Sequence, residues 1–225
     1  MELELLNARD HAGLRLGPPP TGVAHFVQIV PAEFATAAAS CPIFLTKNAE
    51  TGQFYAGAMF GFEPGENLLG SGPGGELFTP LDLERQGFYL ASGGAVAVDP
   101  GHRRFTAGAG QALFETDGRP SPALRRLQHV LGQLQAGVAD TEAFVQALLV
   151  LRLVEPIDID LSFDDGRTMS LQGLYTVSLD RLAELEDGAV LDLFRSGFLA
   201  LIYAMTGSLK QVSRLARLRN DKIAA

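Results

Sequence analysis

The chain has 225 residues, of which 47% are hydrophobic and 20% charged, and its formal net charge is −8 at pH 7. This hydrophobic share excludes a disordered chain. The length suits one large domain or two closely associated halves, because single cores grow to roughly 250–300 residues. An acidic chain lacks the basic surface that displaces counterions from nucleic acid, so we expect no nucleic-acid partner.

Cys41 and the first residues indicate the cellular compartment. Cys41 is the single cysteine, so the chain cannot build a disulfide within itself, and a reducing compartment fits. The N-terminus is acidic where a signal peptide is basic, and no apolar run reaches the roughly 20 residues of a membrane span. We therefore expect a cytoplasmic protein without a transmembrane segment. No base that would activate the Cys41 thiol is visible nearby, so we predict a small buried side chain.

Short strands and turns dominate the first half of the chain. Residues 1–22 end in a proline run that favours an extended, loosely ordered arm. A short helix is predicted over 31–39, because Pro31 suits a first helical turn, and a single helical turn over 81–86. The glycine-rich stretch 70–75 lacks the lysine and the following helix of a phosphate loop, so a hairpin tip is predicted. Strands are predicted over 23–30, 53–62, 88–90, 95–98 and 111–115, and from Ile43.

Helices dominate the second half, from Pro120 onward. Helical spacing predicts one helix from Ser121 to Gly137 and a second from Asp140 to about residue 151. A hairpin over 157–177 follows. Residues 189–205 are apolar on nearly all sides, which predicts a buried central helix. A short helix over 178–185 precedes it, and a last helix over 208–219 places Lys210, Arg214 and Arg217 along one side.

Two groups of residues could carry chemistry. Asp158, Asp160 and Ser162 begin like a calcium loop, but Phe163 stands where that loop needs glycine, so we predict a solvated strand face and no metal site. Histidine is the usual general base, yet His25 sits in a predicted strand, where a hydrogen-bonded structural role is the alternative. His102 and the two arginines after it could contact an anion or form a solvated loop.

Several segments, taken in order, match one known family. The first runs from His25 to Phe44, and the second is GFEPGENL over 61–68. Over about residues 24–219 the chain resembles the SapC family, although it lacks the aromatic run with paired arginines that the family usually has before Phe88. The remaining matching segments are Pro80 with Arg85 and Phe88, LFETDG over 113–118, GLY over 173–175, and GFLALIYA over 197–204 with Ser208 and Leu209.

The resemblance and the patterns together predict an α+β fold. We expect an N-terminal, mostly antiparallel or mixed curled sheet with short helices. It would pack against a C-terminal helical half that contains a β-hairpin and the buried central helix. The predicted division is a proline-rich arm over 1–22 and a single SapC-like domain over 23–225, sheet-rich over 23–119 and helix-rich over 120–225.

The resemblance implies a bacterial protein without known catalytic residues. The family name comes from a link to surface layers, and members accompany TonB-dependent receptors, tryptophan-halogenase-like flavoproteins and cupin-like proteins. We expect a non-enzymatic accessory or binding protein that works with such a partner enzyme or uptake system, without a cofactor, and a homo-oligomer stays open. The alternatives are an enzyme or small-molecule-binding domain with a pocket between sheet and central helix, and a surface-layer component, which would need export.

A ligand or partner site is expected around loops of the first half. Arg85 offers a planar fork to a carboxylate, which could be Glu33, Glu66 or one on a ligand. An internal ion pair that pins the loop is the alternative. The predicted site residues are Glu33, Glu66, Asn67, Pro80, Arg85, Phe88 and His25.

Overall fold

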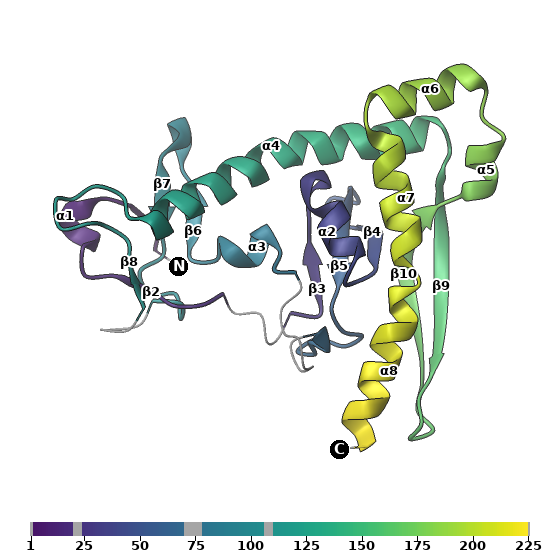
Figure 1. Ribbon diagram of the computed structural model, residues 1–225, viewed down its shortest axis with the longest axis horizontal. Helices are drawn as coiled ribbons and strands as arrows, with labels where there is room; N and C mark the ends of the chain where they lie inside the picture. The colour runs from purple at the N-terminus through teal and green to yellow at the C-terminus, as the bar shows by residue number, and fades with distance from the viewer. Residues whose placement is uncertain (1, 20–23, 70–77, 106–109, 225) are drawn as a thin grey trace. The chain divides into compact units, whose positions relative to one another are not determined.

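A computed structural model describes residues 2–19, 24–69, 78–105 and 110–224 (Figure 1). The chain forms two compact units, each built from two separate stretches of sequence. Unit 1 comprises Met1–Thr21 and Thr79–Ala136, and unit 2 comprises Gly22–Phe78 and Gly137–Ala225. Helices and antiparallel sheets occur in both units, which confirms the α+β class. The division into an arm over 1–22 and one domain over 23–225 stays a prediction.

Unit 1 holds two small antiparallel sheets. One has the order β1 (Glu4–Leu5), β7 (Val96–Val98), β6 (Phe88–Leu90), and the other pairs β2 (Arg15–Leu16) with β8 (Gln111–Ala112). The helices are α1 (Ala8–His11), α3 (Leu81–Glu84), the 3-10 turn η3 (Ser92–Gly94) and the first part of α4 (Pro122–Val150). The buried core consists of Leu16, Phe88, Val98, Leu113, Leu127 and Leu131.

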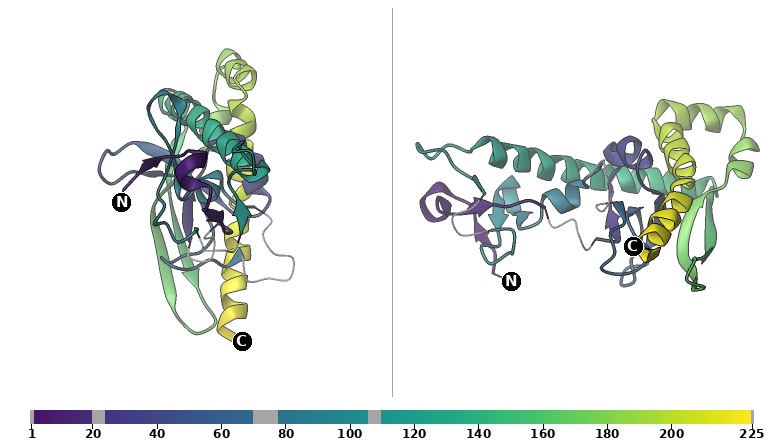
Figure 2. Two further views of the ribbon diagram at one scale, coloured as in Figure 1. Left: turned by 90° about the vertical axis from the view of Figure 1, so that its left-hand side faces the viewer. Right: turned by 60° about the horizontal axis from the view of Figure 1, so that its bottom comes forward.

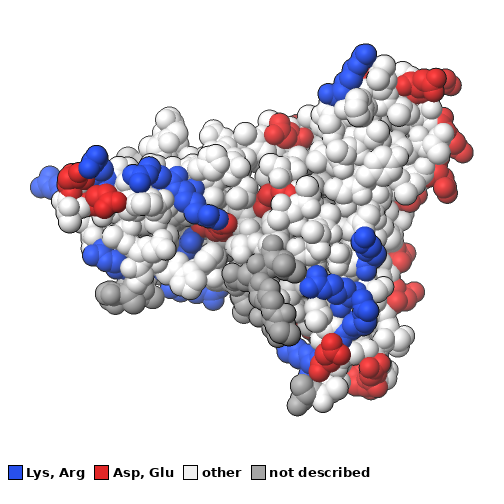
Figure 3. Space-filling model, viewed as in Figure 1, with Lys and Arg blue, Asp and Glu red and all other residues white. Residues whose placement is uncertain are grey.

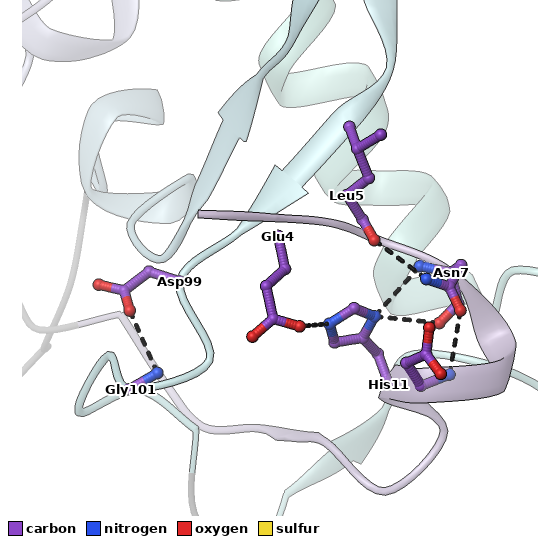
Figure 4. A network of polar contacts seen from close by, with 7 residues as sticks. Glu4, Leu5, Asn7, His11, Asp99 and Gly101 are labelled. Carbon is purple, nitrogen blue, oxygen red and sulfur yellow. Dashed lines mark hydrogen bonds and ion pairs between the residues drawn. The ribbon is translucent and has the colours of Figure 1, made fainter. Parts of the chain in front are cut away.

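The N-terminal arm is more ordered than its proline run predicts. A polar network fixes residues 4–11 (Figure 4): the Nε2 atom of buried His11 lies 3.2 Å from a Glu4 carboxylate oxygen. The Nδ1 atom of His11 accepts a hydrogen bond from the Asn7 backbone N–H at 3.2 Å. The Asn7 side chain caps α1 by accepting from the N–H of Asp10 at 3.0 Å. Since β1 also pairs with β7, strand pairing and this network order the arm.

Unit 2 is built on one five-stranded antiparallel sheet. Its order is β3 (Phe26–Gln28), β5 (Phe54–Met59), β4 (Ile43–Lys47), β10 (Thr168–Val177) and β9 (Val154–Ser162). The predicted hairpin therefore joins the N-terminal strands in one sheet, where Tyr175 of β10 lies opposite Leu45 of β4. Its helices include the 3-10 turn η1 (Pro31–Glu33), α2 (Phe34–Ala38), α5 (Leu179–Ala183), α6 (Asp187–Arg195), α7 (Phe198–Ser208) and α8 (Gln211–Ala224).

The β9–β10 hairpin confirms the alternating pattern read from the sequence. In β9, Ile157, Ile159 and Leu161 are half-buried, while Asp158 and Asp160 are exposed. The apolar face of the hairpin packs on a core that includes residues of α8, and Figures 1 and 2 show α7 and α8 running along the hairpin. The acidic side chains thus lie on a solvated strand face.

The break predicted at Gly137 is wrong, because α4 continues from Pro122 to Val150 as one helix. Gly137 is buried, and a Cβ atom placed on it would lie 2.5 Å from the Cβ atom of Val30. The Thr141 hydroxyl also donates to the Gly137 carbonyl at 2.7 Å, within the helix. Glycine here allows close packing and does not end the helix. Gly132, also in α4, has no atom within 4 Å of such a Cβ.

The predicted central helix over 189–205 is likewise two helices, α6 and α7, with an angle of 90° between α6 and the helical stretch from Phe198. Gly197 sits between them with φ at +78°, a conformation that side chains with a Cβ disfavour. The pair is also not buried as predicted: Ile202 and Met205 are in the core, but Phe194 is 67% exposed. The sharp bend prevents its wide apolar stripe from facing one core.

The other predicted elements are present. Strand β6 has the predicted bounds, β4 begins at Ile43 as predicted, and α8 ends at Ala224, beyond the predicted residue 219. The elements β3, β5, β7, β8, α2, α3 and α5 are shorter than predicted. The hairpin tip predicted over 70–75 lies outside the described residues. The last helix begins at Gln211, and Ser208 does not cap it, because its hydroxyl accepts from the Ile43 N–H at 2.8 Å and donates to the Met205 carbonyl.

Candidate functional site

A groove of about 750 Å³ in unit 2 is the main candidate for a ligand site. It lies between the second half of α4 and the ends of strands β3, β4 and β5 with the turn that joins β4 to β5, and Figure 1 shows α4 passing these strand ends. Its volume is in the range of ligand pockets, roughly 300–1,000 Å³. The lining residues are Phe26, Gln28, Lys47, Asn48, Thr51, Gly52, Gln53, Phe54, Tyr55, Val138, Thr141, Glu142, Val145, Gln146 and Leu149.

Aromatic rings and one cation dominate the strand side of the groove. The Lys47 Nζ atom lies 4.9 Å from the ring centre of Phe54 and 5.4 Å from that of Tyr175. These two rings meet edge to face at 4.9 Å, and Phe26 and Tyr55 do so at 6.4 Å. Such contacts fix the Lys47 ammonium group at the groove. In the described part of the chain, no carboxylate pairs with Lys47.

Glu66, one of the predicted site residues, is held by an arginine that the sequence did not indicate. Arg219 of α8 is 5% exposed, and its Nη2 atom lies 2.9 Å from a Glu63 carboxylate oxygen. Its Nη1 atom lies 3.7 Å from Glu66, and its guanidinium lies 4.5 Å from the Phe163 ring centre. Glu66 also accepts from the Phe62 N–H at 2.8 Å. This Arg219 cluster pins the 61–68 loop to α8 and the β9–β10 turn.

The other predicted site residues of unit 2 serve local structure. The buried Glu33 carboxylate accepts from the Val30 N–H at 2.9 Å, across the start of η1. The Asn67 side chain accepts from the Leu69 N–H at 2.9 Å. His25 is half-buried, and its backbone carbonyl accepts hydrogen bonds from the N–H groups of Phe60 and Gly61. Neither Glu33 nor His25 is among the residues that line the groove.

Pro80, Arg85 and Phe88 belong to unit 1. Pro80 precedes α3, and Phe88 is fully buried in the core, 5.3 Å from the ring of Phe105. Arg85 pairs with Asp82 of its own helix at 2.7 Å, while Arg219 pairs with Glu66. Roles for the seven predicted residues in binding stay predictions.

Arg104, read from the sequence as part of an exposed turn, is 7% exposed. Its guanidinium donates to the carbonyls of Gly17 at 3.1 Å, of Gln86 at 3.2 Å and of Glu84. Burial lowers the pKa of Arg104, and the three carbonyls hold its charged group. Arg104 therefore braces unit 1 beside a second cleft of about 610 Å³, where Arg126 donates to both Glu84 carboxylate oxygens.

Cys41 is fully buried, as predicted, and its thiol donates to the Ala37 carbonyl. Burial raises the pKa of the thiol to about 12, which suppresses the reactive thiolate. Within the described ranges, no three His, Cys, Asp or Glu side chains come together as metal ligands. Over the same ranges, no single helix is both long and apolar enough to cross a membrane.

Large apolar side chains are exposed on α6 and α7. We define this helical surface by Leu191 (44% exposed), Phe194 (67%) and Tyr203 (57%). Leu191 and Phe194 share one side of α6, since they are three residues apart. Figure 3 shows few charged side chains over α7, with lysine and arginine gathered over α8. Nothing in the sequence pattern distinguished this surface from a buried one.

These two units, with their antiparallel sheets, define an α+β protein with surface clefts. The SapC family model matches residues 6–215, and the chain belongs to the SapC family. The match to the family model begins at residue 6, within the N-terminal arm, whereas the resemblance noted in the sequence begins at about residue 24. No curated protein and no solved structure matches the chain.

Proposed function

We propose that this SapC-family protein is a non-enzymatic accessory protein that binds a partner protein through the helical surface of α6 and α7. The observation that supports this proposal is the exposure of Phe194 and Tyr203, at 67% and 57%. Exposed apolar patches mark interaction sites more often than chance, and large aromatic side chains dominate the binding energy of protein interfaces.

The charges around the helical surface favour a particular partner chemistry. From Leu179 to Arg195 the chain has five carboxylates and two arginines. All five carboxylates belong to exposed residues. A partner with an apolar patch and a basic rim complements this surface, since opposite rim charges accelerate association and exclude wrong partners.

The family resemblance supplies the candidate partners. These are a tryptophan-halogenase-like flavoprotein, a cupin-like protein and a TonB-dependent uptake system. The same resemblance, which brings no known catalytic residues, supports a role without catalysis. An association with a surface layer is the remaining alternative.

Binding of the purified flavoprotein and cupin-like protein of the same bacterium tests this function. We expect one of them to bind wild type, and Phe194→Asp to weaken that binding at least tenfold, about the cost of an interface hot spot. Leu5→Asp is the matched control, because Leu5 is 62% exposed but lies on β1 of unit 1. Equal binding by wild type and Phe194→Asp, both with native circular dichroism, would contradict the proposed surface.

The groove beside α4 favours a second candidate function, a ligand-binding domain. The sequence predicted a pocket between the sheet and the central helix, whereas this groove lies between the strand ends and α4. Calorimetric titration of the purified protein with metabolites extracted from its host tests this candidate. A heat signal that disappears in Leu149→Asp, at a groove residue that is 39% exposed, would support a small-molecule site there.

A further inference from the structure

We propose that the groove beside α4 binds an extended peptide segment of a partner protein, which pairs with the free edge of β3 and places an acidic side chain near Lys47. This site is separate from the helical surface and goes beyond the function proposed above. The proposal rests on the backbone of β3, on the α4 side of the groove and on the polar groups that line it.

The free edge of β3 follows from its register with β5. β3 is the outermost strand of the five-stranded sheet. The Phe60 N–H donates to the His25 carbonyl at 2.7 Å, and the Ile29 N–H donates to the Ala56 carbonyl at 3.0 Å. Hydrogen-bonding directions alternate along a strand, so the N–H and C=O groups of residues 26 and 28 point away from β5.

These outward groups lie at the groove. Phe26 and Gln28 both line it, and the described residues provide no hydrogen-bond partner for their outward backbone groups. An unpaired edge is a template for another strand, and adding a peptide strand to an edge is a recurring mode of recognition. A small ring-shaped ligand would not use several backbone groups in a row, so the edge favours a peptide.

The α4 side of the groove offers apolar contacts where this helix passes the strand ends (Figure 1). Val138, Val145 and Leu149 supply them, and the Glu142 carboxylate lies on the same side of α4. Val138 is 60% and Leu149 39% exposed. Val138 follows Gly137, which packs on Val30 just beyond the end of β3, so a peptide paired with β3 would reach α4 near Val138.

Polar side chains in the groove can pair with the backbone and with an acidic side chain of a bound peptide. The amides of Gln28, Gln53 and Gln146 line it without a hydrogen-bond partner among the described residues. Amides can donate to carbonyls and accept from N–H groups of a peptide backbone. Lys47 has no carboxylate partner in that part of the chain, and its ammonium group is held by two aromatic rings. An acidic residue on the peptide would complete the pairing.

Fluorescence anisotropy with defined peptides tests this proposal. The first probe is a labelled peptide of about six residues in which valine alternates with threonine and which ends in glutamate. A second probe ends in lysine, and a third has N-methyl groups on alternate amides, which removes the donors that pair with a strand edge. We expect the first probe to bind, and the other two to bind about tenfold more weakly, the effect of losing two hydrogen bonds or one charge pair.

Three variants locate the site. Val138→Asp should weaken the first probe about tenfold, and Lys47→Glu should reverse the preference between the glutamate and lysine probes. Phe194→Asp, on the helical surface, should leave the binding of the glutamate and lysine probes unchanged. Failure of this proposal is therefore distinguishable from failure of the proposed binding of a partner through the helical surface. Melting curves confirm that each variant is folded. The proposal is overturned if the first probe does not bind, if N-methylation has no effect, or if Lys47→Glu keeps the preference for glutamate.

Discussion

The continuous path of α4 through Gly137 gives a sharp prediction for Gly137→Ala. In an exposed helix this change stabilises a protein by about 0.8–1.0 kcal/mol, because glycine is a poor helix former. At position 137, however, the new Cβ would lie 2.5 Å from the Cβ atom of Val30 and 2.7 Å from each of its methyl carbons. Carbon atoms prefer about 3.5–4.0 Å, so the overlap is about 1 Å.

Val30 cannot move away easily, because it is 2% exposed and its N–H is bonded to Glu33. Overpacking of this kind costs about 1–3 kcal/mol. Gly132→Ala is the matched control, since nothing lies within 4 Å of its new Cβ in the same helix. The gain in helix propensity is common to both variants, so Gly137→Ala should be less stable than Gly132→Ala by about 1–3 kcal/mol.

Urea denaturation followed by circular dichroism measures this difference. Gly132→Ala should have a higher midpoint than wild type, and Gly137→Ala a lower midpoint than Gly132→Ala. Adding Val30→Gly removes all three clashing carbon atoms and should reduce the cost of Gly137→Ala, with a coupling energy of about 1–2 kcal/mol. The reasoning is refuted if the two glycine variants have the same stability, or if Val30→Gly does not change the cost.

Three further predictions concern the packing of both units. Arg219→Ala should destabilise the protein by about 1–3 kcal/mol, because it leaves the largely buried Glu66 carboxylate without its charged partner, while the half-exposed Glu63 carboxylate is solvated. Arg85→Ala should cost less than about 1 kcal/mol, because its pair with Asp82 is local and partly exposed. Urea midpoints of both variants check this difference. The Cys41 thiol, with its pKa raised from 9.0 to about 12, contributes stability that is present below pH 9 and is lost as pH rises toward 12, since the unfolded chain ionises first. Unfolding curves between pH 7 and 11 should show this loss in wild type and not in Cys41→Ala, and iodoacetamide at pH 8 should modify only unfolded protein, as mass spectrometry would reveal. Met205→Ala should lower the free energy of unfolding by about 2–5 kcal/mol, because Met205 is fully buried. Leu191→Ala should lower it by less than about 1 kcal/mol, because Leu191 is 44% exposed. Equal melting temperatures for the two variants would show that the assigned burial is wrong.

Local patterns were sufficient for most individual elements. The alternation around Asp158 and Asp160 predicted the half-buried strand β9, and Pro31 predicted the start of a short helix. These signals work because strand and helix periodicity, and the fixed φ of proline, are properties of neighbouring residues.

Two glycines show where local patterns fail. Gly137 was read as a helix end, but it is needed for contact with Val30, more than 100 residues earlier. Gly197 was read as part of a helix, but its positive φ turns the chain between α6 and α7. A glycine that permits close packing and a glycine that permits a turn look the same in a sequence.

The ion pair at the candidate site also joins residues that are far apart in the sequence, and local patterns do not predict such pairs. The sequence indicates that the 61–68 loop matters and allows an ion pair that pins it. It offers Arg85 as the partner of Glu66, whereas the structure supplies Arg219, which is 153 residues beyond Glu66 in the sequence. The helical surface was missed because an exposed apolar side chain and a buried one are identical in sequence.

The interleaved order of the two units has a consequence for synthesis on the ribosome. Strands β3, β4 and β5 emerge early, but β4 pairs with β10, where Thr46 lies opposite Leu174. The buried Ile43 N–H must also await Ser208, 165 residues later in the chain. All of unit 1 is translated before this sheet can be completed. Strand β4 can pair with β5 early, but its other edge stays unpaired until β10 has been translated. We therefore expect translation speed or chaperone binding over this interval to affect the yield of native protein.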